Sequence, residues 1–361
     1  MPSSSNYSLV EKALHYFAFS TPFVQKALGN LENDLYRGRF RDVVSRDEVF
    51  VTGLPRAGTT LVFDLLFRTG EFNTFTYRHM PFILSPLLWH EVSKSFRKKG
   101  QFIQRAHGDG MQISFDSPEA FEEVVWLSYL EREIVRPHAL SPLKTEAMTS
   151  EFREAFRDTV RKVLAIPRDP KQQVAPRYLS KNNANISRIE AIKDLFPTAT
   201  LLVVFREPLA HACSLAAQHA GFLKRHARDR FSKRYMRWIG HFEFGENLKP
   251  IDFNGWLAGQ PMPLMADASF WLEYWTEAYR HVIDHRTDQV SFVDYDGLLR
   301  EGAGMLARIA ESVDLRNAEQ LVHGAEILRA PTTEPGDTGN LAPELVETAR
   351  STHAGLRSLA I

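Results

Sequence analysis

The chain has 361 residues, of which 44% are hydrophobic, 11% aromatic and 24% charged, a composition that is ordinary for a globular protein. Its 44 basic residues balance 44 acidic ones, which argues against a general polyanion-binding protein and so against nucleic acid as a partner. Cys213 is the single cysteine, which excludes internal disulfides and a cysteine-built zinc site.

Targeting signals are not evident. No stretch approaches the ~20 consecutive apolar residues that a membrane-spanning helix needs, so we expect no membrane span. The segment 1–12 lacks the basic-then-apolar pattern of a secretory signal. We therefore expect a cytoplasmic protein, and its oligomeric state is left open.

The first predicted elements are a helix over 6–28 and a buried strand over 48–52 that ends at Gly53. A glycine loop to Thr60 follows, and then a helix over 61–68. Further strands are predicted at 178–181, 200–205 and 290–294, and further helices at 186–196, 209–219 and 304–313. Strands that alternate with helices predict an α/β fold, with a P-loop-type open parallel sheet flanked by helices.

The stretch 84–170 is rich in helix patterns and has no clear strand. We expect it to be a helical insertion or cap over the sheet rather than a separate domain. The sequence therefore predicts one domain over 1–361, with a core at about 45–315 and the insertion at about 84–170.

The loop after the first strand reads Gly53-Leu54-Pro55-Arg56-Ala57-Gly58-Thr59-Thr60 and has the spacing of a phosphate-binding loop. In such loops backbone N–H groups and the helix dipole hold the phosphate. Two departures matter. Thr59 replaces the lysine expected after the second glycine, and a cation stands inside the loop at Arg56. We expect one compact anionic group to bind here, with Arg56 over its far side.

A second anion site is expected where the strand 200–205 ends, because Arg206 stands there in place of a metal-carrying aspartate. Bidentate bonds from an arginine to a phosphate contribute about 1.5–3 kcal/mol each. Ser214, eight residues later, is about two helical turns further on and offers a hydroxyl. The alternatives are a surface ion pair of Arg206 with Glu207 or its neighbours and a packing role for Ser214. Ligands of open α/β sheets bind at such strand ends.

These motifs together resemble the sulfotransferases that use 3′-phosphoadenosine 5′-phosphosulfate (PAPS), over about residues 49–296. The family's 5′-phosphosulfate loop reads Pro-Lys/Arg-Ser-Gly-Thr-Thr, and residues 55–60 stand in its place with alanine for the serine. Arg206 and Ser214 match the family's 3′-phosphate motif. The resemblance implies a PAPS-dependent enzyme that releases 3′,5′-ADP and requires no metal. It assigns PAPS binding to Arg56, Ala57, Gly58, Thr59, Thr60, Arg206 and Ser214.

The Pro-Arg form of the loop is most similar to the branch that includes tyrosylprotein sulfotransferases and many bacterial enzymes. In that branch a catalytic lysine lies 25 residues before the 3′-phosphate arginine, and Lys181 stands at that distance. The branch's glutamate base is absent, because residues 74–77 before Arg78-x-x-Pro81 contain no acid. The resemblance therefore does not assign the base or the peptide substrate of that branch to this chain. The resemblance implies that Arg56 and Lys181 neutralise charge on the leaving oxygen during in-line transfer.

Several residues are candidates for the base that accepts the proton. His79 follows the loop's helix at the family's acceptor-side position and titrates near neutrality, although it could be an ordinary polar histidine. Glu122, one helical turn before Trp126, could lie in a partly dry pocket that raises its pKa, and Glu123 is its alternative. His107 is a further candidate, in a segment that could equally be a turn.

Two other functions stay open. A P-loop kinase or NTPase predicts Mg²⁺-dependent ATP binding, with Asp294 as its best metal-carrying aspartate. A non-catalytic nucleotide-binding module is the third possibility. Trp271 is a candidate to stack on adenine, against a role in the helix core, and 331–337 resembles the family's late loop over the nucleotide.

The sulfate acceptor is not specified by any motif. Seven basic residues between 224 and 237 favour an anionic acceptor, such as a polysaccharide or a phosphorylated or carboxylated metabolite, or else form a solvated helix face. The helical stretch could equally wall an apolar pocket. Small-molecule, carbohydrate and lipid acceptors are therefore all compatible with the sequence.

Overall fold

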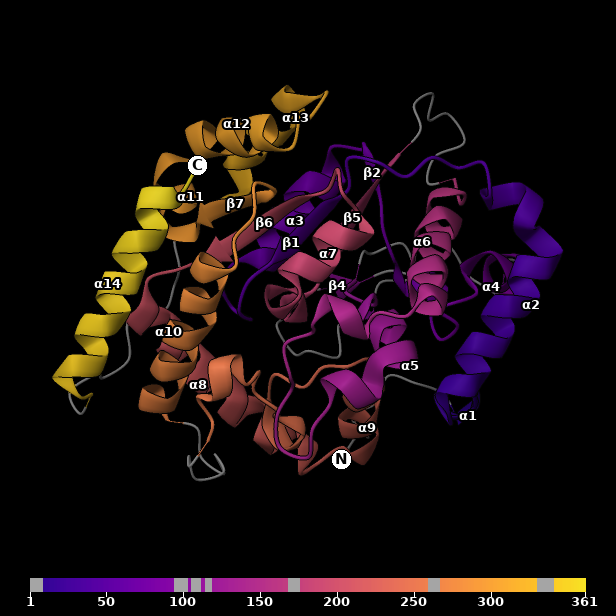
Figure 1. The fold of residues 1–361 in the computed structure, drawn as a ribbon, viewed down its shortest axis with the longest axis horizontal. Coiled ribbons are helices and arrows are strands. Elements are labelled where there is room, and N and C mark those ends of the chain that lie inside the picture. The colour runs from indigo at the N-terminus through magenta and orange to yellow at the C-terminus, as the bar shows by residue number, and fades with distance from the viewer. Residues whose placement is uncertain are drawn as a thin grey trace.

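A five-stranded parallel sheet lies at the centre of the protein (Figure 1). The computed structural model describes residues 9–93, 103–104, 112–113, 119–167, 176–258, 267–329 and 341–361. The strands, in sheet order, are β2 (Phe72–Asn73), β5 (Arg177–Lys181), β1 (Val49–Thr52), β6 (Thr200–Phe205) and β7 (Val290–Asp294). The predicted α/β fold, with an open parallel sheet flanked by helices, is confirmed. β2, only two residues long, was not predicted from the sequence.

The register of the sheet brings the ends of three strands to one edge. Val51 of β1 pairs with Lys181 on one side and with Leu202 on the other. The loop after β1 therefore leaves the sheet between the end of β5 and the end of β6. Lys181 stands at the first of these ends and Arg206 at the second.

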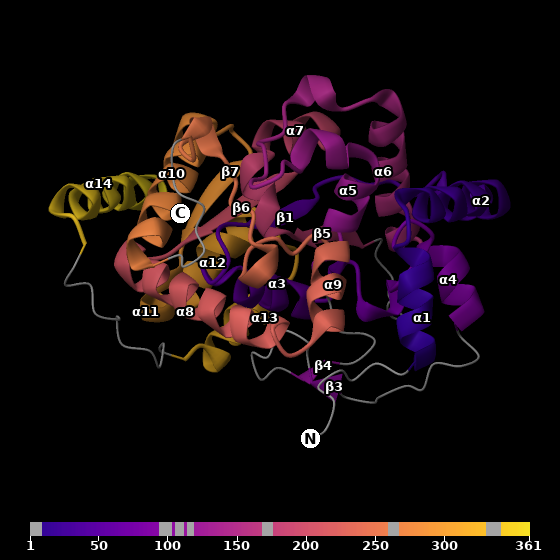
Figure 2. The same cartoon turned by 90° about the horizontal axis from the view of Figure 1, so that it is seen from below.

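Helices cover both faces of the sheet (Figures 1 and 2). Alternate residues of β6 point to opposite faces, so that Leu201 and Val203 belong to one core and Leu202 and Val204 to the other. The smaller core includes α3 (Thr59–Arg68), α11 (Tyr295–Glu301), α12 (Ala303–Ser312) and α13 (Ala318–His323). The larger core includes α5 (Glu123–Ile134), α6 (Ser150–Leu164), α7 (Ile189–Leu195), α8 (Pro208–His226), α10 (Ala268–Asp284) and α14 (Pro343–Leu359).

The helical stretch expected at 84–170 connects β2 to β5. Its described part contains α4 (Pro86–Ser93), α5 and α6, and the antiparallel pair β3 (Ile103–Gln104) and β4 (Gln112–Ile113). The sequence shows no clear strand here, and this pair of two-residue strands was not predicted. Because β2 and β5 are parallel neighbours, the stretch forms the crossover between them. The division into core and insertion stays a prediction.

Several helix bounds differ from the sequence prediction. The single N-terminal helix is in fact two, α1 (Leu9–Ala18) and α2 (Pro22–Phe40), because Pro22 cannot continue a helix but fits the first turn of a new one. α8 runs on to His226, and α9 (Arg230–Trp238) follows it. Short 3₁₀ helices are η1 (Tyr77–His79), η2 (Thr145–Ala147), η3 (Asn183–Ser187), η4 (Gly245–Asn247), η5 (Phe253–Gly255) and η6 (Gly324–Ile327). Within the described ranges, no helix is long and apolar enough to cross a membrane.

Candidate functional site

The loop after β1 approaches its neighbours so closely that two of its positions exclude a side chain. Gly53 has a φ of 141°, and a Cβ there would lie 2.3 Å from the carbonyl oxygen of Val204 in β6. Gly58 has a φ of 100°, and a Cβ there would lie 2.1 Å from Cδ2 of the Tyr295 ring. The two glycines of the motif are thus required by the packing of β6 and of α11 against the loop.

Two buried side chains from different helices hold the loop backbone. The imidazole Nε2 of His211 in α8 is 2.7 Å from the carbonyl oxygen of Pro55. The hydroxyl of Tyr279 in α10 accepts the N–H of Leu54 at 3.3 Å and donates to the carbonyl oxygen of Val204 at 2.8 Å. The loop is therefore fixed to α8, α10 and β6 at once.

His211 is neutral, and this explains its bond to the loop. Burial lowers the pKa of His211 to about 3, and the nearby guanidinium groups of Arg206 and Arg56 add to the effect against the opposing bond to Pro55. A neutral imidazole with its proton on Nε2 donates that proton to the Pro55 carbonyl. Because both guanidinium groups act on one ring, Arg56 of the loop and Arg206 at the end of β6 both lie close to His211.

The N-terminus of α3 opens onto the loop without a side-chain cap. Gly58 is the N-cap, and its carbonyl oxygen accepts the N–H groups of the two residues after Thr60. The N–H groups of Thr59 and Thr60 have no partner inside the helix and lie at the positive end of its dipole. The N–H of Ala57 instead donates back to the carbonyl of Leu54 at 3.2 Å. These features fit a compact anion at the start of α3.

A second set of donors lies beside the loop. Arg206 is 8% exposed and lies over the Tyr295 ring at 5.7 Å from its centroid. Its Nε has no hydrogen-bond partner among the described residues, and its ion pair with Asp296 is long, at 3.9 Å. Ser214 accepts a hydrogen bond from Nε of Arg56 at 3.4 Å. The structure therefore joins the loop cation to the predicted second site, where a buried guanidinium N–H is unsatisfied.

The carboxylates at this edge have structural partners. Glu207 accepts a backbone N–H of α8 at 2.7 Å, which caps the helix, and the acidic partner of Arg206 is Asp296. Asp294 accepts the N–H of Asp296 at 3.0 Å and lies 3.8 Å from both Arg300 and Arg357. In the described part of the chain, no group of three or more His, Cys, Asp or Glu side chains could hold a metal ion.

A polar chain extends from the loop on its other side. Asn183, in η3 just after β5, accepts a hydrogen bond from the Thr59 hydroxyl at 3.2 Å and donates to Oε1 of Glu243 at 3.3 Å. Glu243 and Asn183 line a cleft together with Leu54 and Pro55 of the loop. The cleft thus meets the first half of the loop, at Leu54 and Pro55.

The carboxyl group of Glu243 has a lowered pKa. Burial alone would raise the pKa of Glu243, but His241, whose Nδ1 is 3.4 Å from Oε2, and Lys181 at the end of β5 outweigh it, so that the pKa is lowered. Sequence reasoning missed Glu243, His241 and Asn183. No motif spacing marks them, because Glu243 and His241 come from the segment after α9 and meet η3 only in the folded chain.

Glu122 and Glu123 are held in buried structural contacts. Glu122 is 1% exposed and accepts hydrogen bonds from Trp126 Nε1 at 3.1 Å, Asn185 Nδ2 at 2.9 Å and the Tyr178 hydroxyl at 3.0 Å. Glu123 forms a bidentate ion pair with Arg188, at 2.6 and 2.8 Å. Because their oxygens are occupied in these networks, the contacts argue against either carboxylate as the proton acceptor.

His79 lies in η1 and is 5% exposed. Its Nδ1 accepts the N–H of Thr76 at 2.9 Å, so the proton of the neutral ring is on Nε2 and this nitrogen is a donor. Trp271 is 1% exposed and packs among other aromatic rings, which supports a core role over adenine stacking. His107 and the segment 331–337 lie outside the described residues.

Comparison with known proteins agrees with this geometry. A model of the sulfotransferase family matches residues 48–249, more than half of the 361 residues, and the chain belongs to that family. No curated protein matches the sequence significantly. Sulfotransferase STF1 from Mycobacterium tuberculosis H37Rv is similar in structure, with a TM-score of 0.51 and 14% identity over 98% of this chain and 88% of that one. STF9 from Mycobacterium avium has a TM-score of 0.51 and 12% identity over 98% and 87%. Both likenesses show the fold.

The substitution His211→Gln should make folding less sensitive to acid. The folded pKa of about 3 lies below the ordinary value of 6.5, so the unfolded chain binds this proton more readily. The stability that depends on neutral His211 is complete above about pH 6.5 and declines as the pH falls toward 3. Each such proton contributes about 1.4 kcal/mol per pH unit to the slope. Urea unfolding between pH 7 and 5 should show a shallower slope for the variant, by up to that amount. The control is His323→Gln, at an exposed histidine. If the unfolding free energy of His211→Gln changed with pH as steeply as that of the control, the prediction would be wrong.

Proposed function

We propose that this sulfotransferase takes its sulfuryl group from PAPS, passes it in line to a hydroxyl or amine of an acceptor, and releases 3′,5′-ADP. The contact between Arg56 and Ser214 carries this proposal, because it joins the two anion sites around His211. The uncapped start of α3 fits a 5′-phosphosulfate. The unsatisfied Nε–H of Arg206 fits a 3′-phosphate on the same nucleotide.

The transfer forms a bond from the acceptor oxygen or nitrogen to sulfur and breaks the bond from sulfur to the bridging oxygen of the phosphosulfate. That bridging oxygen gains negative charge, and the acceptor loses a proton. We assign the neutralisation of this charge to Arg56, inside the loop, and to Lys181, at the end of the adjacent strand β5. The backbone donors at Gly58, Thr59 and Thr60 hold the phosphate in place, and the proposal requires no metal.

We propose that Glu243 is the base that accepts the proton lost by the acceptor. Its carboxylate lies in the cleft beside Leu54 and Pro55, and Asn183 connects it to Thr59 of the loop. A base at this position lies on the acceptor side of the phosphate cradle, within reach of a hydroxyl brought to the loop. His79 is the alternative, and the pH dependence of turnover separates the two.

The cleft also bears on the class of acceptor. Its walls are mostly apolar, and they include Phe242, Leu248, Ile251 and Tyr274. The cleft has a volume of only about 20 Å³, so an acceptor with an aromatic or aliphatic surface, whether a small molecule or one end of a carbohydrate or lipid, would enter only if these walls moved apart. We also propose that the protein acts in the cytoplasm.

Ligand binding tests the choice of donor. Binding of 3′,5′-ADP at 100 times its dissociation constant stabilises a protein by about 2.7 kcal/mol, so it should raise the melting temperature by several degrees without Mg²⁺. ATP with Mg²⁺ should change the melting temperature little. Thermal shift measurements with both ligands decide between the functions. Stabilisation by ATP with Mg²⁺ alone would favour a kinase or NTPase and refute the proposal.

The substitution Arg206→Ala should weaken 3′,5′-ADP selectively. Loss of a charge-assisted contact of about 1.5–3 kcal/mol lowers affinity about 10- to 150-fold. Binding of 5′-AMP, which lacks the 3′-phosphate, should be unchanged when both are measured by calorimetry. Arg308→Ala, at a half-exposed arginine of α12, is the matched control. An equal effect on the two nucleotides would show that Arg206 does not contact the 3′-phosphate.

The pH profile tests the base. Because its pKa lies below the ordinary 4.5, Glu243 is ionised down to mildly acidic pH, and the acid limb of kcat/KM should lie below about 4.5. A histidine base with an ordinary pKa would place that limb near pH 6.5. Glu243→Gln should lower kcat about 10²- to 10⁴-fold while 3′,5′-ADP still binds, as measured by labelled-sulfate transfer from PAPS to an acceptor mixture. Full activity in Glu243→Gln, with loss in His79→Gln, would return the role to His79; Glu311→Gln is the control.

A further inference from the structure

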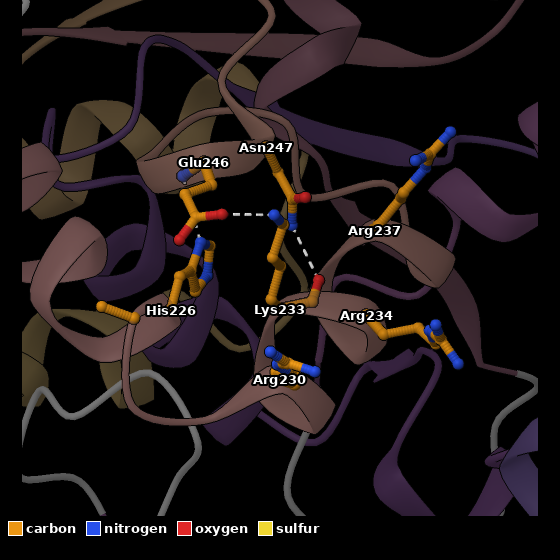
Figure 3. Close-up of a pocket in the computed structure, with 8 residues that line it drawn as sticks. His226, Arg230, Lys233, Arg234, Arg237, Glu246 and Asn247 are labelled. Atoms are coloured by element: carbon orange, nitrogen blue, oxygen red, sulfur yellow. Dashed lines mark hydrogen bonds and ion pairs between the residues drawn. The ribbon is translucent and has the colours of Figure 1, made fainter. Parts of the chain in front are cut away.

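A separate pocket of about 540 Å³ lies between the end of α8, α9 and η4 (Figure 3). Four cations of α9 line it, at Arg230, Lys233, Arg234 and Arg237. Their spacing of three and four residues places all four on one face of the helix. Among the lining residues, Glu246 alone is acidic. The pocket therefore carries a local positive charge in a chain whose formal net charge is zero.

The other face of α9 is apolar and packs on the N-terminal helix. Phe231 and Tyr235 contact His15 of α1, and Trp238 contacts Tyr16. This packing fixes the orientation of α9 and turns its cationic face toward the pocket. Like charges four residues apart destabilise a helix by about 0.2–0.5 kcal/mol per pair, and the cationic face contains two such pairs. Folding alone does not account for this arrangement.

Two of the four cations are already engaged. Lys233 forms an ion pair with Glu246, and Arg234 donates to the Tyr16 hydroxyl at 2.9 Å. Arg230 and Arg237 have neither a hydrogen bond nor an ion pair through their side chains within the described part of the chain. In Figure 3, Lys233 reaches Glu246 while Arg230 and Arg237 lie apart from this pair. Two guanidinium groups at the pocket are thus available to a ligand.

The pocket walls are held by hydrogen bonds. Nδ1 of His226 accepts the N–H of Glu246 at 3.1 Å, and Nδ2 of Asn247 donates to the carbonyl oxygen of Lys233 at 2.8 Å (Figure 3). His226 is 2% exposed, and its Nε2 has no hydrogen-bond partner among the described residues. Burial lowers the pKa of His226, and Lys233 adds to the effect. A pocket whose walls are fixed before binding loses little conformational freedom when a ligand enters.

We propose that this pocket binds the phosphate or sulfate ester group of a small anionic ligand, at a site distinct from the nucleotide site. The planar donor fork of an arginine, here Arg230 or Arg237, matches the oxygens of such an ester. A volume of about 540 Å³ accommodates a sugar-sized ligand. The segment that carries Glu246 also carries Glu243, so one short stretch of chain contributes to the lining of both the ester site and the cleft. This inference does not depend on the donor nucleotide.

The imidazole of His226 reports on the site directly. In protein labelled with ¹³C-histidine, its signal is assigned by its loss in His226→Gln. Glucose 6-phosphate should shift this signal saturably and raise the pKa of His226, because an anion favours the charged ring, whereas glucose should do neither. Arg230→Ala combined with Arg237→Ala should weaken binding at least tenfold. Arg286→Ala combined with Arg350→Ala removes the same charge from exposed positions elsewhere and should leave binding unchanged.

Three outcomes would overturn the proposal. The first is no shift of the His226 signal with glucose 6-phosphate, and the second is equal affinity in the Arg230/Arg237 variant with an unchanged melting temperature. The third separates a soluble ester from a lipid headgroup. If vesicles of phosphatidic acid, and not of phosphatidylcholine, bound the wild type but not this variant, while glucose 6-phosphate gave no response, α9 would be a membrane-contact face rather than a pocket for a small ester. No PAPS is needed, so failure here is distinct from failure of the proposed function.

Discussion

The hydrogen bond from His211 to the Pro55 carbonyl is the contact on which the site depends. It ties the glycine loop to α8, the helix that begins directly after Arg206. Ser214 lies three residues after His211 and so on the same face of α8, where it meets Arg56 of the loop. One helix therefore holds the loop backbone and carries the second anion site, and the spacing between the two sites is set by the rigidity of α8. Burial keeps His211 neutral, so the bond persists across physiological pH and adds no third positive charge between the two arginines.

The sheet order supplies the second constraint. Because β1 lies between β5 and β6, the loop is flanked by Lys181 on one side and Arg206 on the other. The two sides have different chemistry. On the β6 side the Nε–H of Arg206 has no hydrogen-bond partner among the described residues and only a long ion pair, which suits the binding of a phosphate. On the β5 side Lys181 is close to an ionised carboxylate, Glu243, and this combination suits the movement of a proton and the stabilisation of a leaving oxygen.

Much of this arrangement could be predicted from the sequence, because it is encoded locally. The strands at 200–205 and 290–294 are predicted by their largely apolar sequences, and the loop is recognised by the spacing of its glycines. β2 was missed because two residues are too few to show an alternation of hydrophobic and polar side chains. Its strand conformation depends on pairing with β5. The candidates for the base were chosen from local spacing, with His79 first and Glu122 or Glu123 second, and local spacing does not show that Glu122 accepts three hydrogen bonds in the core. Glu243 reaches the loop through tertiary packing of the segment after α9, for which a sequence pattern gives no signal.

A crystal structure of the protein with 3′,5′-ADP tests the central claim most directly. We expect the 5′-phosphate to accept hydrogen bonds from the N–H groups at the start of α3. We expect the 3′-phosphate to lie against Arg206 and the Ser214 hydroxyl, with Arg206 drawn away from Asp296. A nucleotide that bound with its 3′-phosphate in solvent, while Arg206 stayed beside Asp296, would contradict the account of a loop and a helix that hold the two ends of one ligand.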